Sequence, residues 1–199
     1  MVDVDDAVIL AGGRGTRMLP GSNYVPKEIM PLVDTPIINH LIWEACKASV
    51  KRIHIVISPI KRDILTKIFS DNNKHRNNSI RPDLPRIALE PIPEGVEIII
   101  HEQIEPGGVG DAILLATNEI NGPFLVLLGD NLLINDHIDP KKSGPKFASN
   151  SCKKLVDYYN RNGKPCAGIL EVPDKEVHKY GIVRLDDDLI KEMLLKVTE

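Results

Sequence analysis

The stretch that decides the fold of this chain is VILAGGRGTRMLPGSNYVPK, residues 8–27. An apolar run over residues 7–11 ends abruptly in GGRGTR, a pattern that predicts a buried strand leading into a glycine-rich turn. Glycines let the backbone of such a turn approach a ligand closely, and its successive N–H groups can form a concave anion site. Arg17 and Lys27 add cations suited to phosphate oxygens, so the stretch predicts a phosphate-binding loop.

Two other interpretations of these glycines are open to the sequence. The first is a plain tight turn, which the glycine spacing alone would favour, but the cations Arg14, Arg17 and Lys27 around the loop favour phosphate binding. The second is a dinucleotide-binding oxidoreductase domain, but GGRGTR lacks the GxGxxG spacing, and no acidic residue closes a strand about 20 residues later. The segment also lacks the GK[ST] ending of a P-loop.

The composition is that of an ordinary globular protein. Of 199 residues, 42% are apolar and 27% are charged, and the formal net charge of −3 gives no basic field for nucleic acid. The acidic start MVDVDD is unlike a leader, and no apolar run reaches membrane-spanning length. Cys46, Cys152 and Cys166 lack metal-ligand spacing and indicate reduced thiols. We therefore expect a single domain over residues 1–199, located in the cytoplasm, without nucleic-acid or membrane partners.

Strand and helix patterns alternate along the chain. Apolar runs predict strands at residues 4–11, 52–58, 97–101, 124–128 and 167–172, and a hairpin formed by 180–185 and 189–195. Helical spacing predicts helices at residues 37–46, 60–69, 113–116 and 152–162, the last one capped by Gly163. Polar connections are expected at 70–86 and 138–151. This order predicts an α/β fold with a mostly parallel, doubly wound sheet, helices on both faces, and ligands at the carboxyl ends of the strands.

Three ring side chains are more typical of packing or surface positions than of catalysis. His40 and Trp43 lie off the most apolar stripe of the helix predicted at 37–46, so we expect them at the surface or against a partner. His54 lies inside the strand predicted at 52–58 and is typical of a packed strand residue.

Two further loops follow predicted strands and can meet the first loop at one edge of the sheet. QIEPGGVGDA, residues 103–112, contains Gln103 and Gly108, although composition alone would make it a generic turn. The strand at 124–128 runs straight into Gly129 and Asp130. A carboxylate there suits the magnesium that accompanies a triphosphate, whereas this short motif alone indicates a turn-capping aspartate equally well.

The longer pattern resembles a known family. LAGGRGTRMLP followed by PKEIMPLVDTPII is similar to the N-terminal signature (G)GxGTRxxP…PK of the sugar-1-phosphate nucleotidyltransferases. Within that family the resemblance is strongest to bacterial-type UTP–glucose-1-phosphate uridylyltransferases, and next to glucose-1-phosphate thymidylyltransferases. The resemblance implies a three-layer, Rossmann-like nucleotidyltransferase fold. It also implies a reaction in which an NTP and a sugar 1-phosphate give an NDP-sugar and pyrophosphate.

The resemblance implies a role for each matching residue. Arg17 would contact the leaving pyrophosphate, Lys27 would bind the α-phosphate and hold the sugar phosphate, and Asp130 would bind a Mg²⁺ ion on the α-phosphate. The Gln103 amide would read the base edge, which suits uracil or thymine because an amide both donates and accepts. The implied nucleotide-binding residues are Leu10, Ala11, Gly12, Gly13, Gly15, Thr16, Arg17, Gln103 and Gly108.

The resemblance weakens toward residue 199. VPDKEVHKYGIV, residues 172–183, resembles the segment leading to the family's sugar site and nominates Gly181, although a glycine at a strand start is nearly as good an interpretation. The family's E-K-P triplet is replaced by Leu195, Lys196 and Val197, so only Lys196 is kept as a sugar-phosphate residue. The rest of the family's catalytic domain, including a second metal-binding Asp, has no counterpart, so we expect a sheet truncated on its C-terminal side.

Two functions stay open on the sequence. The first is an active Mg²⁺-dependent enzyme that transfers a uridylyl or thymidylyl group from UTP or dTTP to glucose 1-phosphate. The second is a non-catalytic nucleotide-binding module, such as a subunit or a degenerate paralogue. The phosphate loop and Asp130 favour the first, and the lost E-K-P triplet favours the second. The chain would be a fragment, a shortened homologue or one partner of a shared site, and apolar surface left by a shortened sheet would favour a homo-oligomer.

Overall fold

The structure is a computed structural model that describes residues 3–32, 35–69, 92–133, 149–187 and 189–194. The chain divides into two compact units, Met1–Cys166 and Ala167–Glu199. The expectation of a single domain over residues 1–199 stays a prediction. The loop expected at 70–86, most of that at 138–151, and Lys196 lie outside the described residues. In the described part of the chain, no helix is both long and apolar enough to cross a membrane.

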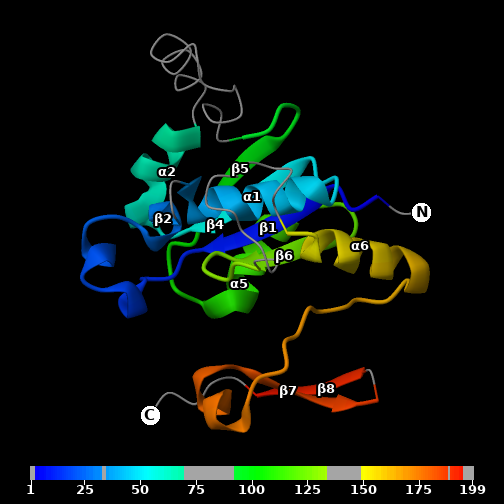
Figure 1. The fold of residues 1–199 in the computed structure, drawn as a ribbon. Coiled ribbons are helices and arrows are strands. Elements are labelled where there is room, and N and C mark those ends of the chain that lie inside the picture. Colours follow the sequence, from blue (N-terminus) through cyan, green and yellow to red (C-terminus); the bar gives the residue numbers. More distant parts are fainter. Residues whose placement is uncertain (1–2, 33–34, 70–91, 134–148, 188, 195–199) are drawn as a thin grey trace. The chain divides into compact units, whose positions relative to one another are not determined.

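Four of the described strands form a parallel sheet in the first unit, in the spatial order β5-β4-β1-β6 (Figure 1). The strands are β1 (Asp6–Ala11), β4 (Arg52–Ile57), β5 (Glu97–Glu102) and β6 (Phe124–Leu128). β1 lies between β4 and β6, and its Leu10 is paired with Val56 on one side and Leu128 on the other. Because parallel strands end at the same edge, the loops that follow these four strands meet there.

Helices cover both faces of this sheet (Figure 1). On one face, Ile9 and Ile55 share a core with α1 (Ile37–Lys47), α2 (Arg62–Phe69) and α6 (Ser151–Asn162). On the other face, Val8 and Val56 pack against α5 (Gly108–Thr117). Side chains alternate along a strand, so the uninterrupted apolar sequence of β1 supplies both cores. The predicted α/β architecture with helices on both faces of a parallel sheet is confirmed.

The helix ends follow local sequence signals. The short antiparallel pair β2 (Pro31–Leu32) and β3 (Thr35–Pro36) leads directly into α1, and Pro36 suits the start of a helix because its φ is fixed. α6 ends at Gly163, whose φ of 64° is left-handed and whose N–H donates to the carbonyl of Tyr159 at 2.7 Å. The predicted glycine cap is confirmed.

The second unit contains a hairpin, as predicted. The 3-10 helix η6 (Asp174–Lys179) precedes the antiparallel pair β7 (Ile182–Asp186) and β8 (Leu189–Leu194). The strand predicted at residues 167–172 is wrong, because this segment has no regular structure and its Ile169 and Leu170 are exposed. A strand needs a neighbour for its N–H and C=O groups, and none of the described strands pairs with this segment.

One ring side chain of the first unit, that of Trp43, is more buried than expected. The prediction of a surface position for Trp43 is wrong, since only 5% of this residue is exposed. α1 packs against α6 as well as the sheet-side core, so a second stripe of the helix is covered. His40 is half-buried, with its ring edge-on to Trp43 at a centroid distance of 5.7 Å. His54 is fully buried in β4, which confirms its prediction.

Candidate active site

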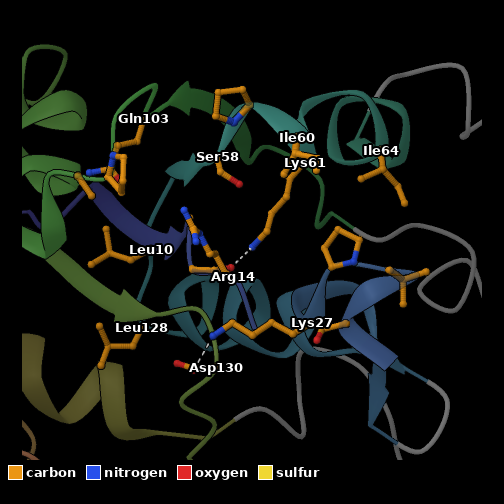
Figure 2. A pocket seen from close by; sticks show the side chains of 18 of the residues that line it. Leu10, Arg14, Lys27, Ser58, Ile60, Lys61, Ile64, Gln103, Leu128 and Asp130 are labelled. Carbon is orange, nitrogen blue, oxygen red and sulfur yellow. Dashed lines mark hydrogen bonds and ion pairs between the residues drawn. The ribbon is translucent and has the colours of Figure 1, made fainter. Parts of the chain in front are cut away.

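A cleft of about 910 Å³ lies at the carboxyl edge of the sheet, where the loops after the four parallel strands meet (Figure 2). This volume is within the range of small-molecule sites. The structure brings seven predicted residues to the cleft from loops far apart in sequence. They are Leu10, Gly12, Gly13, Lys27, Gln103, Gly108 and Asp130. Arg14 also lines the cleft.

The end of β1, just before the glycine-rich loop, packs tightly against the loop that follows β6. The Gly129 N–H donates to the carbonyl of Leu10 at 2.9 Å, and a Cβ on Gly129 would lie 2.5 Å from that same oxygen. Only glycine fits there without moving the backbone. Gly15 has a left-handed φ of 69° and precedes η1 (Thr16–Met18), so the chain reverses out of the loop at a position where glycine is unstrained.

Lys27 and Asp130 form an ion pair inside the cleft. Lys27 begins the 3-10 helix η3 (Lys27–Ile29), and Asp130 lies two residues beyond the end of β6. The Lys27 Nζ and Asp130 Oδ2 atoms are 2.6 Å apart, and Figure 2 shows the two side chains converging. The Lys27 side chain is 12% exposed and the Asp130 side chain 51% exposed, so the carboxylate is open to a ligand. A cation donor and an anionic acceptor therefore lie next to the predicted phosphate loop.

A buried lysine that the sequence did not single out holds the glycine-rich loop. Lys61 Nζ donates to the carbonyls of Ala11 at 2.6 Å and Gly13 at 2.7 Å, and it pairs with Glu28 Oε2 at 2.9 Å. Burial lowers the pKa of Lys61 below its usual range, and the Glu28 carboxylate opposes that shift. With its charge compensated, the ammonium can bind two loop carbonyls at once and fix the path of the loop (Figure 2).

Gln103 is held by the end of β4 and by the first turn of α5. Its backbone N–H donates to the carbonyl of Ile57, and its side-chain Nε2 donates to the Gly108 carbonyl at 3.1 Å and to Asp111 Oδ2 at 2.6 Å. A Cβ on Gly12 would lie 3.4 Å from Gln103 Oε1, so the amide oxygen faces the glycine-rich loop. Asp111, which sequence reasoning missed, therefore fixes the orientation of the amide predicted to read a base.

The remaining predicted residues are placed less fully. Ala11 ends β1 and gives its carbonyl to Lys61, and Thr16 starts η1. The backbone of Arg17 lies in η1, but its side chain lies outside the described part of the chain. Gly181 precedes β7 in the second unit, and the structure does not relate it to the cleft. The roles of Gly181, Lys196 and the Arg17 side chain stay predictions.

The position of Lys61 shortly after a strand is a sequence signal for its role. Lys61 closes the 3-10 helix η4 (Pro59–Lys61), which directly follows β4, so it belongs to a fourth loop at the carboxyl edge. The sequence prediction placed residues 60–69 in one helix and so overlooked this loop. Its partner Glu28 follows Lys27 directly and is fully buried, and a buried carboxylate needs a cation such as Lys61 beside it.

The parallel sheet, its flanking helices and the cleft at its carboxyl edge define a Rossmann-like α/β protein. The family model described as Nucleotidyl transferase matches residues 6–198, and the chain belongs to this family. The predicted family and fold are confirmed.

Curated relatives and solved structures agree with this assignment. The chain is 33% identical over 187 residues to a UTP–glucose-1-phosphate uridylyltransferase of Staphylococcus epidermidis, covering 92% of this chain and 60% of the relative. It is 32% identical over 188 residues to UTP–glucose-1-phosphate uridylyltransferase 2 of Streptococcus pyogenes serotype M3, covering 92% of this chain and 59% of that one. The chain thus spans about 60% of the length of the curated relatives it matches.

Two solved structures show the same fold. A UDP-glucose pyrophosphorylase complexed with UDP-glucose matches with a TM-score of 0.74 at 28% identity, over 98% of this chain and 70% of that one. A UTP-bound UGPase from Acinetobacter baumannii matches with a TM-score of 0.76 at 26% identity, over 98% of this chain and 69% of that one.

Proposed function

We propose that this chain supplies the nucleotide-binding part of a nucleotidyltransferase that moves a uridylyl group, or a thymidylyl group, from an NTP to glucose 1-phosphate. The observation that carries the proposal is the Lys27–Asp130 ion pair beside the glycine-rich loop. The pair supports the proposal because a lysine suited to a phosphate and a carboxylate suited to a metal line the same cleft. The relatives named for UTP and glucose 1-phosphate support the choice of substrates.

The chemistry that fits this arrangement needs no protein nucleophile. An oxygen of the sugar phosphate attacks the α-phosphorus, a new P–O bond forms, and the bond to the departing pyrophosphate breaks. Catalysis is then positioning and charge stabilisation. In this proposal the loop N–H groups and Arg17 bind the triphosphate, and Lys27 leaves Asp130 to bind the α-phosphate. Gln103 contacts the edge of the uracil or thymine base.

Asp130 fits the carboxylate that such a site needs for magnesium. Mg²⁺ is usually held by one or two carboxylates together with substrate phosphates, and the Asp130 carboxylate is half-exposed within the cleft. When bound, the ion would neutralise phosphate charge. Asp130 would hold it, and Lys27 would turn to the phosphate.

The proposal also includes a location and an assembly state. Cys46, Cys152 and Cys166 are free thiols, which suits a reducing cytoplasm. The homo-oligomer expected from exposed apolar surface stays part of this proposal.

The test is an assay of pyrophosphate release by the purified chain with Mg²⁺, glucose 1-phosphate and each NTP in turn. Release with UTP or dTTP that requires glucose 1-phosphate is the expected result. Nucleotide binding without release would instead favour a non-catalytic binding module, the alternative that fits the replaced E-K-P triplet. Absence of any nucleotide binding would overturn both functions.

A further inference from the structure

A second cluster of ligand-type side chains lies on the α5 face of the sheet. His54 of β4, His101 of β5 and Glu119, just after α5, place one ligand atom each within 4.8 Å of one another. His54 is fully buried, His101 is half-buried and Glu119 is exposed, so the cluster is reached from the Glu119 side. None of these three described residues lines the cleft of the candidate active site.

The two imidazoles face each other through their nitrogens. His54 Nδ1 and His101 Nε2 are 2.9 Å apart, and the rings are stacked with centroids 5.2 Å apart. The paired positions explain the contact, because Val56 is opposite His101 in the parallel register and His54 is two residues earlier on the same face of β4. Two nitrogen donors are therefore brought to one point by the sheet itself.

A carboxylate behind His54 fixes the tautomer that a metal needs. His54 Nε2 lies 3.1 Å from Asp6 Oδ1, and Arg52 donates to both Asp6 oxygens at 2.8 and 2.7 Å. An ionised Asp6 can only accept, so the proton lies on His54 Nε2, and the lone pair of Nδ1 points at His101. This carboxylate–histidine arrangement is the one that usually orients metal-bound imidazoles.

We propose that His54, His101 and Glu119 bind a divalent transition metal ion, with Zn²⁺ as the best match. Two imidazole nitrogens and one carboxylate form a set typical of zinc, with a fourth position open, whereas Mg²⁺ and Ca²⁺ prefer oxygen ligands alone. This site is distinct from the magnesium position proposed at Asp130, and it does not depend on the proposed transferase activity.

The imidazole pair requires only a small adjustment, while the Glu119 carboxylate, which lies within 4.8 Å of the nitrogens, must come closer. Zn–N bonds of about 2.0–2.1 Å in a tetrahedron put two ligand nitrogens about 3.3 Å apart. The imidazoles must therefore separate by about 0.4 Å from their present 2.9 Å contact. His101 lies on β5, at the edge of the described sheet, and Glu119 lies in an exposed turn, so neither side chain is enclosed on all sides. The His101 proton shifts from Nε2 to Nδ1 as the metal takes its place.

The bound ion would join three elements around the predicted base-reading segment. His101 is two residues before Gln103, and Glu119 follows the helix that Gly108 begins. An ion there would tie β4, β5 and the end of α5 together. Its expected effect is therefore stabilisation of this segment, in addition to any effect on catalysis.

The test uses the full chain, stripped of metal with a chelator and titrated with Zn²⁺ in competition with a chromophoric chelator. We expect one Zn²⁺ per chain, with a Tm raised by about 5–10 °C at a hundredfold excess over Kd. His101→Ala and Glu119→Gln should weaken binding at least about 10-fold each. The matched controls His178→Ala and Glu94→Gln change residues elsewhere in the chain and should leave it unchanged.

Co²⁺ substitution separates this site from binding by cysteines. The expected visible spectrum has nitrogen and oxygen ligation without thiolate charge-transfer bands. Since Glu119 is exposed, Glu119→Gln should fold even if His101→Ala does not. Unchanged Zn²⁺ affinity in a folded Glu119→Gln, thiolate bands, or no binding of Zn²⁺ would each overturn the proposal.

Discussion

Lys27 Nζ lies 2.6 Å from Asp130 Oδ2, although the two residues are 103 positions apart in the chain. The contact exists because Lys27 belongs to the segment after β1, Asp130 follows β6, and these parallel strands are neighbours. In the proposed reaction the ion pair opens, so that Lys27 binds a phosphate and Asp130 binds a metal ion.

Replacing the lysine should abolish most of the proposed turnover. We expect Lys27→Ala to lower kcat for pyrophosphate release about 10²–10³-fold at saturating substrates, because a charged donor to the reacting phosphate is lost. The control Lys164→Ala removes an exposed lysine that follows α6 and should keep normal turnover. Near-normal kcat in Lys27→Ala would remove this lysine from the mechanism.

The close approach of Gly129 to the end of β1 predicts an intolerance to a single methyl group. Gly129→Ala should destabilise the fold by about 1–3 kcal/mol, because its Cβ would lie 2.5 Å from the Leu10 carbonyl oxygen. Gly110→Ala is the matched control, since its Cβ meets nothing within 4 Å and alanine favours a helix. Urea unfolding of both variants measures the difference, and equal stability would contradict the tight packing.

The buried Lys61–Glu28 ion pair predicts that the stability effects of mutating its two members are not additive. Lys61→Met should cost about 3–5 kcal/mol because it leaves the Glu28 carboxylate buried and unpaired. The double variant Lys61→Met, Glu28→Leu should cost less than the sum of the single changes, since no unpaired charge is left. A double-mutant cycle in urea measures this coupling, and strict additivity would show that the pair is not coupled.

The sequence predicted the fold well because its strongest signals are local. The apolar run of β1 with the glycines after it, Gln103 after β5 and Asp130 after β6 were enough to predict that three loops meet at one edge. Lys61 and Asp111 were missed because their roles arise from polar contacts with distant backbone or with a side chain, which no periodicity reports.

The failures at Trp43 and at residues 167–172 have a related cause. Whether a helix stripe is covered depends on a second helix far along the chain, here α6. Whether an apolar run becomes a strand depends on a neighbour with free N–H and C=O groups. Neither fact is encoded in the segment itself.

The contacts of Asp6 with Arg52 and His54 predict how stability changes in acid. Burial alone would raise the pKa of Asp6, but hydrogen bonds from Arg52 and His54 outweigh it and lower the pKa below its ordinary value. Such a carboxyl contributes stability that is complete above its unfolded pKa of about 3.9 and is lost as the pH falls through the folded value. Asp6→Asn should therefore be less stable than the unchanged chain at about pH 5, with the difference shrinking toward about pH 2.

Urea unfolding at both ends of that pH range measures the effect. Asp174→Asn, which changes an exposed aspartate of the second unit, serves as the control and should show no pH-dependent difference. A gap between Asp6→Asn and the unchanged chain that stays constant with pH would contradict the lowered pKa.

The most direct test of the central claim is a calorimetric titration of the chain with UTP in the presence of Mg²⁺, repeated on Asp130→Asn. We expect one UTP per chain, with binding that depends on Mg²⁺ in the unchanged chain and loses most of that dependence in the variant. UTP binding that is absent, or that is equally strong and equally Mg²⁺-dependent in Asp130→Asn, would contradict a nucleotide site built around the Lys27–Asp130 pair.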